Sequence, residues 1–181
     1  MDSEKIKLIK RAKKGDGKAF EDLIGESKIN LYKMAFLYVK NKNDALDIVS
    51  EAVFKTYSSL HTLKNDKYFN TWTMRILINC CKDFLRKKQK VVLLPEREDG
   101  SNPLDNIPDD PDLFLDERMD LYDAIDCLEN AQLKSVIILK YFKGMTIKET
   151  AQVLELPEGT VKTYLHRALL FLRRKLKEDV G

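Results

Sequence analysis

Polar and basic side chains recur along one side of the segment from residue 158 to residue 167. Glu158, Lys162 and His166 follow one another at intervals of four residues, and Thr163 and Arg167 lie beside them. Four-residue spacing places side chains on one face of a helix. Side chains of these types hydrogen-bond to base edges and to phosphates, so the segment predicts a contact with duplex DNA.

An apolar stripe on the opposite side would anchor this helix. Its members follow at intervals of four, three, four and four residues: Val161, Leu165, Ala168, Leu172 and Leu176. Such spacing is typical of a helix with one buried face. A helix that is anchored on one face and basic on the other has the geometry that enters a major groove. For this segment alone, an ordinary amphipathic helix with a solvated charged face remains the alternative.

A shorter helix precedes the basic one. Thr146, followed three residues later by Glu149, predicts a capping box at its start. Glu155 falls at the corner, where a left-handed backbone costs a residue other than glycine about 1 kcal/mol. Pro157 is suited to the first position of the next helix. The apolar face of the shorter helix would consist of Ile147, Ala151 and Leu154. Together the two segments predict a helix-turn-helix.

Helical periodicity also fills the first half of the chain. One helix is expected to bury a stripe made of Tyr32, Ala35, Phe36 and Val39. A second would begin with Asn43 as its N-cap and run to about Leu60, with Asp44 in its first turn. Its inward-facing residues would be Ala45, Ile48, Val49 and Ala52. A third would run from about Thr71 to Lys90, with a repeat at Thr73, Leu77, Cys81 and Leu85.

Charge is divided unevenly along the chain. The net charge is only +3, but residues 95–126 hold twelve acidic and two basic side chains, which leaves +13 on the remainder. Four of the five prolines fall between residues 95 and 111, as in a linker. Basic modules attract phosphate backbones. We therefore expect an all-α fold with two small helical domains, residues 1–90 and 116–181, joined by an acidic flexible linker, residues 91–115.

No pattern in the sequence indicates catalysis, a metal site or a cofactor. The chain has two histidines, His61 and His166, and its three cysteines have neither a CxxC pattern nor metal-ligand spacing. It has no glycine-rich phosphate loop and no nucleophile elbow. The N-terminus lacks the apolar core of a signal peptide, and no run approaches the roughly 18 apolar residues that a membrane span needs. We predict a cytoplasmic protein that is not an enzyme, uses no cofactor and does not insert into a membrane.

Three segments of the chain together resemble one family. Residues 157–163 (PEGTVKT), followed by His166-Arg167-Ala168, resemble region 4 of the extracytoplasmic-function (ECF) sigma factors of the sigma-70 family. Residues 44–54 (DALDIVSEAVF) resemble region 2.2, although Ser50 stands where the family often has Gln. Residues 72–88 resemble the helix of regions 2.3 and 2.4. The resemblance covers about residues 16–177 in the family's order and spacing.

The resemblance implies a function and three sets of site residues. A sigma factor binds core RNA polymerase and directs initiation at promoters, with region 4 on the −35 duplex and the region 2 helical bundle on the melted −10 element. The −35 contacts would be Glu158, Thr160, Lys162, Thr163, Tyr164, His166 and Arg167. The −10 contacts would be Lys64, Asn65, Tyr68, Arg75, Asn79, Lys82 and Arg86. The core polymerase contacts would be Asp44, Asp47, Ile48, Glu51 and Phe54.

The family also implies partners. Region 2.2 docks on the clamp helices of the polymerase β′ subunit, region 4 meets the β flap, and promoter DNA is bound by both domains. Members of this group are usually held by an anti-sigma factor, which is often anchored in the membrane. The acidic linker would thread towards the active-site channel of the polymerase, where Asp105, Asp109, Asp110 and Asp112 could imitate nucleic acid.

Two other interpretations stay open at this point. A stand-alone helix-turn-helix regulator would bind duplex DNA tightly without the polymerase. A protein-interaction adaptor that resembles a sigma factor would bind core polymerase and start transcription at no defined promoter. The pairing of residues 44–54 with the helix-turn-helix favours the sigma factor over both.

Overall fold

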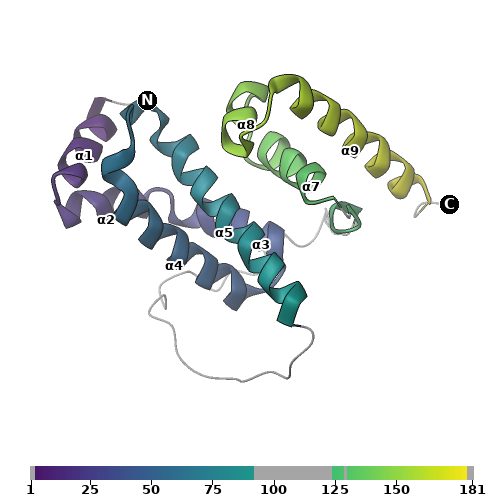
Figure 1. The fold of residues 1–181 in the computed structure, drawn as a ribbon, viewed down its shortest axis with the longest axis horizontal. Helices are drawn as coiled ribbons and strands as arrows, with labels where there is room; N and C mark the ends of the chain where they lie inside the picture. The colour runs from purple at the N-terminus through teal and green to yellow at the C-terminus, as the bar shows by residue number, and fades with distance from the viewer. Residues whose placement is uncertain (1–2, 92–123, 129, 179–181) are drawn as a thin grey trace. The chain divides into compact units, whose positions relative to one another are not determined.

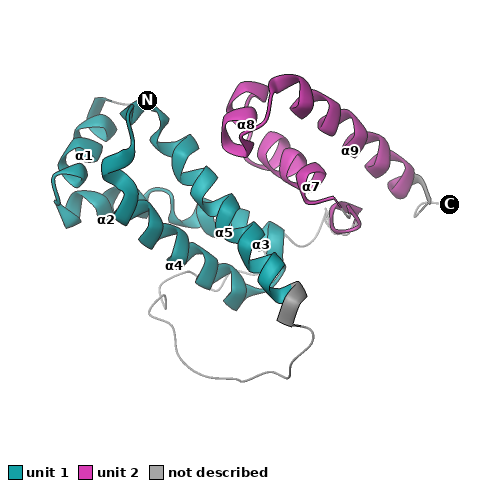
Figure 2. Cartoon of the chain, in the orientation of Figure 1, with its two compact units in different colours: residues 1–103 teal, residues 104–181 magenta. Residues whose placement is uncertain are grey.

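A computed structural model describes residues 3–91, 124–128 and 130–178. It divides the chain into two compact units, residues 1–103 (unit 1) and residues 104–181 (unit 2) (Figure 2). All regular elements in the described ranges are helices, so the predicted all-α fold with two helical bodies is confirmed. Most of the predicted linker, including Asp105, Asp109, Asp110 and Asp112, lies outside the described residues.

In its described residues, 3–91, unit 1 is a bundle of five α-helices with two short 3₁₀ turns between the last two (Figure 1). In chain order these are α1 (Ser3–Lys13), α2 (Gly17–Gly25), α3 (Lys28–Val39), α4 (Lys42–Ser59), η1 (Leu60–Thr62), η2 (Asp66–Tyr68) and α5 (Phe69–Val91). α4 packs against both α3 and α5, and α1 packs against α2 and the two turns. The segment from residue 60 to residue 68 is therefore held between α4, α5 and α1.

The core of unit 1 follows the predicted helical patterns in α4 and α5. The predicted inward residues of α4 are all buried: Ala45, Ile48, Val49 and Ala52. In α5, Thr73, Leu77 and Cys81 are buried and Leu85 is half-buried. A second cluster joins α1 and α2 to the 60–69 segment through Ile9, Ala12, Phe20, Leu23, Leu60, Leu63 and Phe69. Trp72 is half-buried against this cluster.

Two predictions for unit 1 are wrong in detail. In α3 only Ala35 of the predicted stripe is buried, whereas the buried face consists of Leu31, Met34, Ala35, Leu37 and Tyr38. The N-cap of α4 is Asn41 and not Asn43, because the Asn41 side chain accepts a hydrogen bond from Asp44 N at 3.0 Å. Lys40, left-handed at φ 53°, ends α3 directly before it, so the new helix begins at once.

The described part of unit 2 contains helical residues 124–126, followed by three α-helices and a π-helical turn. These are α7 (Ala131–Ile137), the turn η4 (Ile138–Phe142), α8 (Ile147–Leu154) and α9 (Glu158–Glu178). The core joins Ala124, Ile125 and Leu128 to Ile137 and to Ala168 and Leu172 of α9. Leu165 and Leu176 pack against it half-buried, so the predicted apolar stripe of α9 lies on the core side.

The predicted helix-turn-helix is confirmed at its corner. Thr146 and Glu149 form the predicted capping box at the start of α8. Glu155 takes the left-handed conformation, with φ 55° and ψ 42°. α9 begins at Glu158, one residue later than predicted, and Pro157 contributes the carbonyl that accepts from Val161 N at 3.1 Å. α8 and α9 pack against each other.

The cysteines differ in exposure. Cys80 and Cys81 are buried in α5, whereas Cys127 is exposed. Among the described residues, no helix is long and apolar enough to cross a membrane.

Candidate nucleic-acid interface

One face of α9 presents the side chains that were predicted to contact duplex DNA. Glu158, Lys162, Thr163, His166 and Arg167 are exposed. Thr160 and Tyr164 are half-buried. The Thr163 hydroxyl donates to Gly159 O at 3.0 Å, so its oxygen remains able to accept. The interface on unit 2 is thus a row of cationic and hydrogen-bonding groups along the first half of α9.

Buried contacts on the other side fix the orientation of this row. Val161 and Ala168 are both 0% exposed, and Ala151 and Leu154 of α8 are buried as well. Since α9 is held by its apolar face, its polar face must point outward.

The α8 cap links the stability of the helix-turn-helix to pH. Hydrogen bonds from the Thr146 backbone and then from its side chain lower the pKa of Glu149. Thr146 N donates to Glu149 Oε2 at 2.9 Å, and Glu149 N donates to Thr146 Oγ1 at 3.2 Å. A carboxyl whose pKa is lower in the folded state stabilises that state above its unfolded pKa, and the effect disappears as pH falls through the folded pKa.

We expect Thr146→Ala to destabilise α8 by about 1 kcal/mol at neutral pH, because it removes one half of the capping box. The loss should shrink in acid, where Glu149 is protonated in both variants. Amide hydrogen exchange in α8 and α9 between neutral pH and pH values below the carboxyl range measures it. Thr146→Ser keeps the hydroxyl and serves as the control. Equal protection in all three proteins at neutral pH would contradict the prediction.

Unit 1 has a pocket on the face where α4, η1 and α5 meet. Its volume is about 460 Å³, and it is lined by Phe54, Lys55, Ser58, Ser59, His61, Ile76, Asn79 and Cys80. Of the predicted −10 contacts, Asn79 lines this pocket. The other predicted −10 contacts do not line the pocket. Phe54, which is predicted to bind the polymerase, does line it. Lys55, Ser58 and Ser59 were missed by the sequence analysis, although their spacing on α4 places them on one face.

The pocket combines neutral and cationic groups. Lys55 Nζ lies 2.6 Å from Glu51 Oε1, and this hydrogen bond raises the pKa of Lys55. Burial raises the pKa of the Cys80 thiol, so this wall stays uncharged. Asn79 is exposed and offers both an amide donor and a carbonyl acceptor. Such a set can hydrogen-bond a base edge, and Phe54 and Ile76 provide apolar surface.

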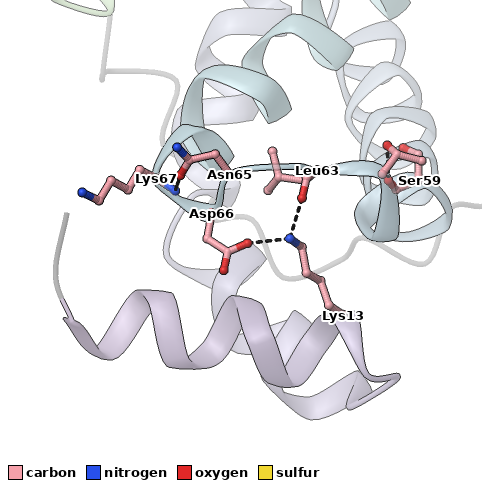
Figure 3. A network of polar contacts seen from close by, with 7 residues as sticks. Lys13, Ser59, Leu63, Asn65, Asp66 and Lys67 are labelled. Atoms are coloured by element: carbon pink, nitrogen blue, oxygen red, sulfur yellow. Dashed lines mark hydrogen bonds and ion pairs between the residues drawn. The ribbon is translucent and has the colours of Figure 1, made fainter.

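The segment between α4 and α5 carries three predicted −10 contacts on its surface. Lys64, Asn65 and Tyr68 are exposed. Asn65 Oδ1 accepts from Lys67 N at 3.0 Å and so starts η2, which leaves its amide group to donate. Figure 3 shows this segment above α1, with Lys13 reaching up to it.

Three cationic side chains of α5 were predicted to hold phosphates. Arg86 is exposed and pairs with Asp83 at 3.0 Å. Arg75 and Lys82 are half-buried. A phosphate that binds Arg86 must compete with this exposed ion pair, which contributes little to stability.

Not all of the predicted polymerase contacts on α4 are exposed on the surface. Ile48 is 1% exposed and belongs to the core of unit 1, so its prediction as an apolar contact is wrong. Asp44 is half-buried, and its Oδ2 accepts from Lys88 Nζ at 2.9 Å. Asp47 and Glu51 are exposed, and Phe54 is 70% exposed. The surface that α4 offers a partner is therefore carried by Asp47, Glu51 and Phe54.

Comparisons with known proteins match both units. A family model described as "Sigma-70 region 2" matches residues 23–91, and one described as "Sigma-70, region 4" matches residues 118–172. The RNA polymerase sigma factor SigV of Bacillus subtilis is 35% identical over 162 residues, which cover 87% of this chain and 92% of the relative. The ECF RNA polymerase sigma factor SigW of the same organism is 30% identical, covering 95% and 96%.

Solved structures with the same fold include two complexes. One is CnrH with the cytosolic domain of CnrY, with a TM-score of 0.72 at 21% identity, covering 97% of this chain and 98% of that one. The other is the sigma factor RpoE with the anti-sigma factor NepR from Bartonella quintana, with a TM-score of 0.64 at 21% identity, covering 87% and 98%. At these identities the likeness concerns the fold.

Proposed function

The chain belongs to the sigma-70 family, in its ECF group, and from this premise we propose that unit 2 recognises the −35 element as duplex while unit 1 recognises the melted −10 element. As a sigma factor, it directs promoter-specific transcription initiation. We assign region 2 to residues 1–90, the connector to residues 91–115 and region 4 to residues 116–181. Core RNA polymerase and promoter DNA are its partners.

The observation that supports the −10 assignment best is the position of Asn79 in the pocket of unit 1. A single-stranded base is recognised through its hydrogen-bonding edge and through stacking on apolar or aromatic side chains. Asn79 offers the first and Phe54 the second, and both line one pocket of about 460 Å³. That volume lies within the range of pockets that hold small organic molecules, roughly 300–1,000 Å³. A base flipped out of the duplex would occupy this pocket.

The surface of α4 suits a basic partner. Asp47 and Glu51 are exposed on it, one turn apart, and Phe54 adds a large apolar side chain. We assign these three side chains to the clamp helices of the β′ subunit, and Phe54, which also lines the pocket, would contact both the polymerase and the base. Because Glu51 also pairs with Lys55 at the pocket, polymerase binding and base binding would share one ion pair.

We further propose that region 4 binds the β flap of the polymerase. We also propose that an anti-sigma factor controls the protein. The two solved structures described above are complexes with partner proteins: CnrH is bound to the cytosolic domain of CnrY, and RpoE is bound to the anti-sigma factor NepR. We extend this proposal to an anti-sigma factor that is anchored in a membrane and binds this chain through a cytosolic domain.

In vitro transcription with core polymerase and a library of genomic promoters tests the proposed function. Initiation at a set of promoters that share spaced −35 and −10 sequences is expected. Failure to start at any such pair would contradict it. Tight duplex binding by the isolated chain would instead favour a stand-alone regulator, and binding to core without initiation would favour an adaptor.

We expect Asn79→Ala to reduce the preference for one base of the −10 element by about tenfold, because a base-specific contact is worth about 1–3 kcal/mol. Single-stranded −10 oligonucleotides with each of the four bases at each position, bound to holoenzyme, measure the preference. Asn30→Ala removes an exposed amide from α3, away from the pocket, and is the matched control. An unchanged preference at all positions in Asn79→Ala would remove this residue from base recognition.

A further inference from the structure

Lys13, the last residue of α1, binds the segment that connects α4 to α5. Its Nζ lies 2.5 Å from Asp66 Oδ1 and donates to Leu63 O, also at 2.5 Å (Figure 3). Both charged side chains are largely buried, with 23% of Lys13 and 17% of Asp66 exposed. One ammonium group thus joins two points of the segment to a helix that lies 50 residues earlier in the chain.

The contact of Lys13 lies next to a turn and an apolar cluster. Leu63 N donates to Leu60 O and closes η1, and the Leu63 carbonyl lies just past that turn, where it accepts from Lys13. Asp66 is the first residue of η2. On the buried side, Leu60 and Leu63 pack in one cluster with Ile9 and Ala12. Without Lys13, a largely buried carboxylate and a carbonyl would both lose their partner, which favours a shift of the segment towards water.

The same segment bears the groups assigned to −10 recognition. His61 lines the pocket. Lys64 and Asn65 lie between the two points that Lys13 holds, Tyr68 follows the second point, and all three are exposed. The position of these side chains depends on the path of residues 63–66. Base recognition is sensitive to such a shift, because hydrogen bonds weaken steeply when their geometry changes.

We propose that Lys13 is a positioning residue that sets the base preference of −10 recognition by fixing the 60–68 segment from behind. This inference rests on the proposed function, since it requires that the segment and its pocket recognise −10 bases. It extends the promoter-recognition apparatus to α1, which lies outside the residues 23–91 that match region 2.

Selection of DNA by holoenzyme tests this role. Holoenzyme is assembled with the full chain and selects from single-stranded DNA that carries a randomised stretch, and sequencing gives the base preference at each position. The test variants are Lys13→Met, which keeps the length of the side chain, and Asp66→Asn, which removes the other charge. Lys13→Arg keeps a cationic donor. Lys5→Met is the matched control, because Lys5 is also a largely buried lysine of α1 but pairs with Glu26, the residue that follows α2.

The preference is a ratio of affinities, so a smaller folded fraction leaves it unchanged. We expect Lys13→Met to flatten the preference by about tenfold, the size of one base contact. Asp66→Asn should flatten it less, because the bond to Leu63 O remains, while Lys13→Arg and Lys5→Met should retain it. Wild-type preference in Lys13→Met and Asp66→Asn, or equal flattening in Lys5→Met, would overturn the positioning role alone. Absence of any preference in wild-type holoenzyme would overturn this role together with the proposed −10 assignment.

Discussion

Replacing Lys162 and Arg167 together by alanine is expected to lower the affinity of holoenzyme for promoter duplex by about 30-fold near physiological salt. Each phosphate contact contributes about −0.9 to the slope of log affinity against log salt, so the slope should become shallower by about 2. Both side chains are exposed on α9, and the core contacts of that helix lie on its other face. The fold of unit 2 should therefore survive the change.

Fluorescence anisotropy of a labelled −35 duplex, titrated with holoenzyme at several salt concentrations, gives both quantities. Lys7→Ala with Lys10→Ala removes the same two charges from exposed positions of α1 and is the matched control. If the control lowers the slope equally, the effect comes from net charge and the α9 face is not the duplex contact. An unchanged slope in the Lys162 and Arg167 variant would also mean that the α9 face is not the duplex contact.

Leu77→Ala is expected to destabilise unit 1 by about 2–5 kcal/mol, the usual cost of truncating a buried leucine. Leu77 is 0% exposed and lies on the side of α5 that faces the bundle. Denaturant unfolding followed by tryptophan fluorescence isolates this unit, because Trp72 is the one tryptophan of the chain and packs against its core.

Asn79→Ala is the control for this measurement. It lies two residues further along α5 but is exposed, so its effect should stay within about 0.5 kcal/mol. The two variants should therefore have different effects. Leu77→Ala should lower stability and leave the base preference intact, whereas Asn79→Ala should reduce the base preference and leave stability nearly unchanged. A loss below about 1 kcal/mol in Leu77→Ala would mean that the bundle refills the space.

The features that the sequence predicted well are those fixed by local chemistry. The capping box needs only Thr146 and Glu149 at the right spacing, and the α9 stripe has polar residues between its apolar ones. α3 is different, because residues 34–39 are apolar with no polar interruption (MAFLYV), so periodicity alone has no preferred face. Packing against α4 and α5 selects the face that contains Leu31 and Tyr38.

Competition between similar residues explains the cap of α4. Asn41 and Asn43 are both good N-caps, and the choice depends on where α3 ends. Ile48 shows another limit, since a motif places a residue in a family pattern but does not say which side of the helix is buried. The pocket could not be predicted from local sequence patterns. Lys55, Ser58 and Asn79 come together only when α4 and α5 are paired, and no local spacing specifies this pairing.

The contrast between the cysteines provides a built-in distance probe. Cys80 and Cys81 are buried, so a thiol-reactive dye should attach to the exposed Cys127 of unit 2 in the native protein. Trp72 of unit 1 can then serve as the energy donor and the dye on Cys127 as the acceptor, so the unmodified sequence provides both labelling positions. Energy transfer would follow the separation of the two units as core polymerase, promoter DNA or an inhibitor protein is added, without a single engineered substitution.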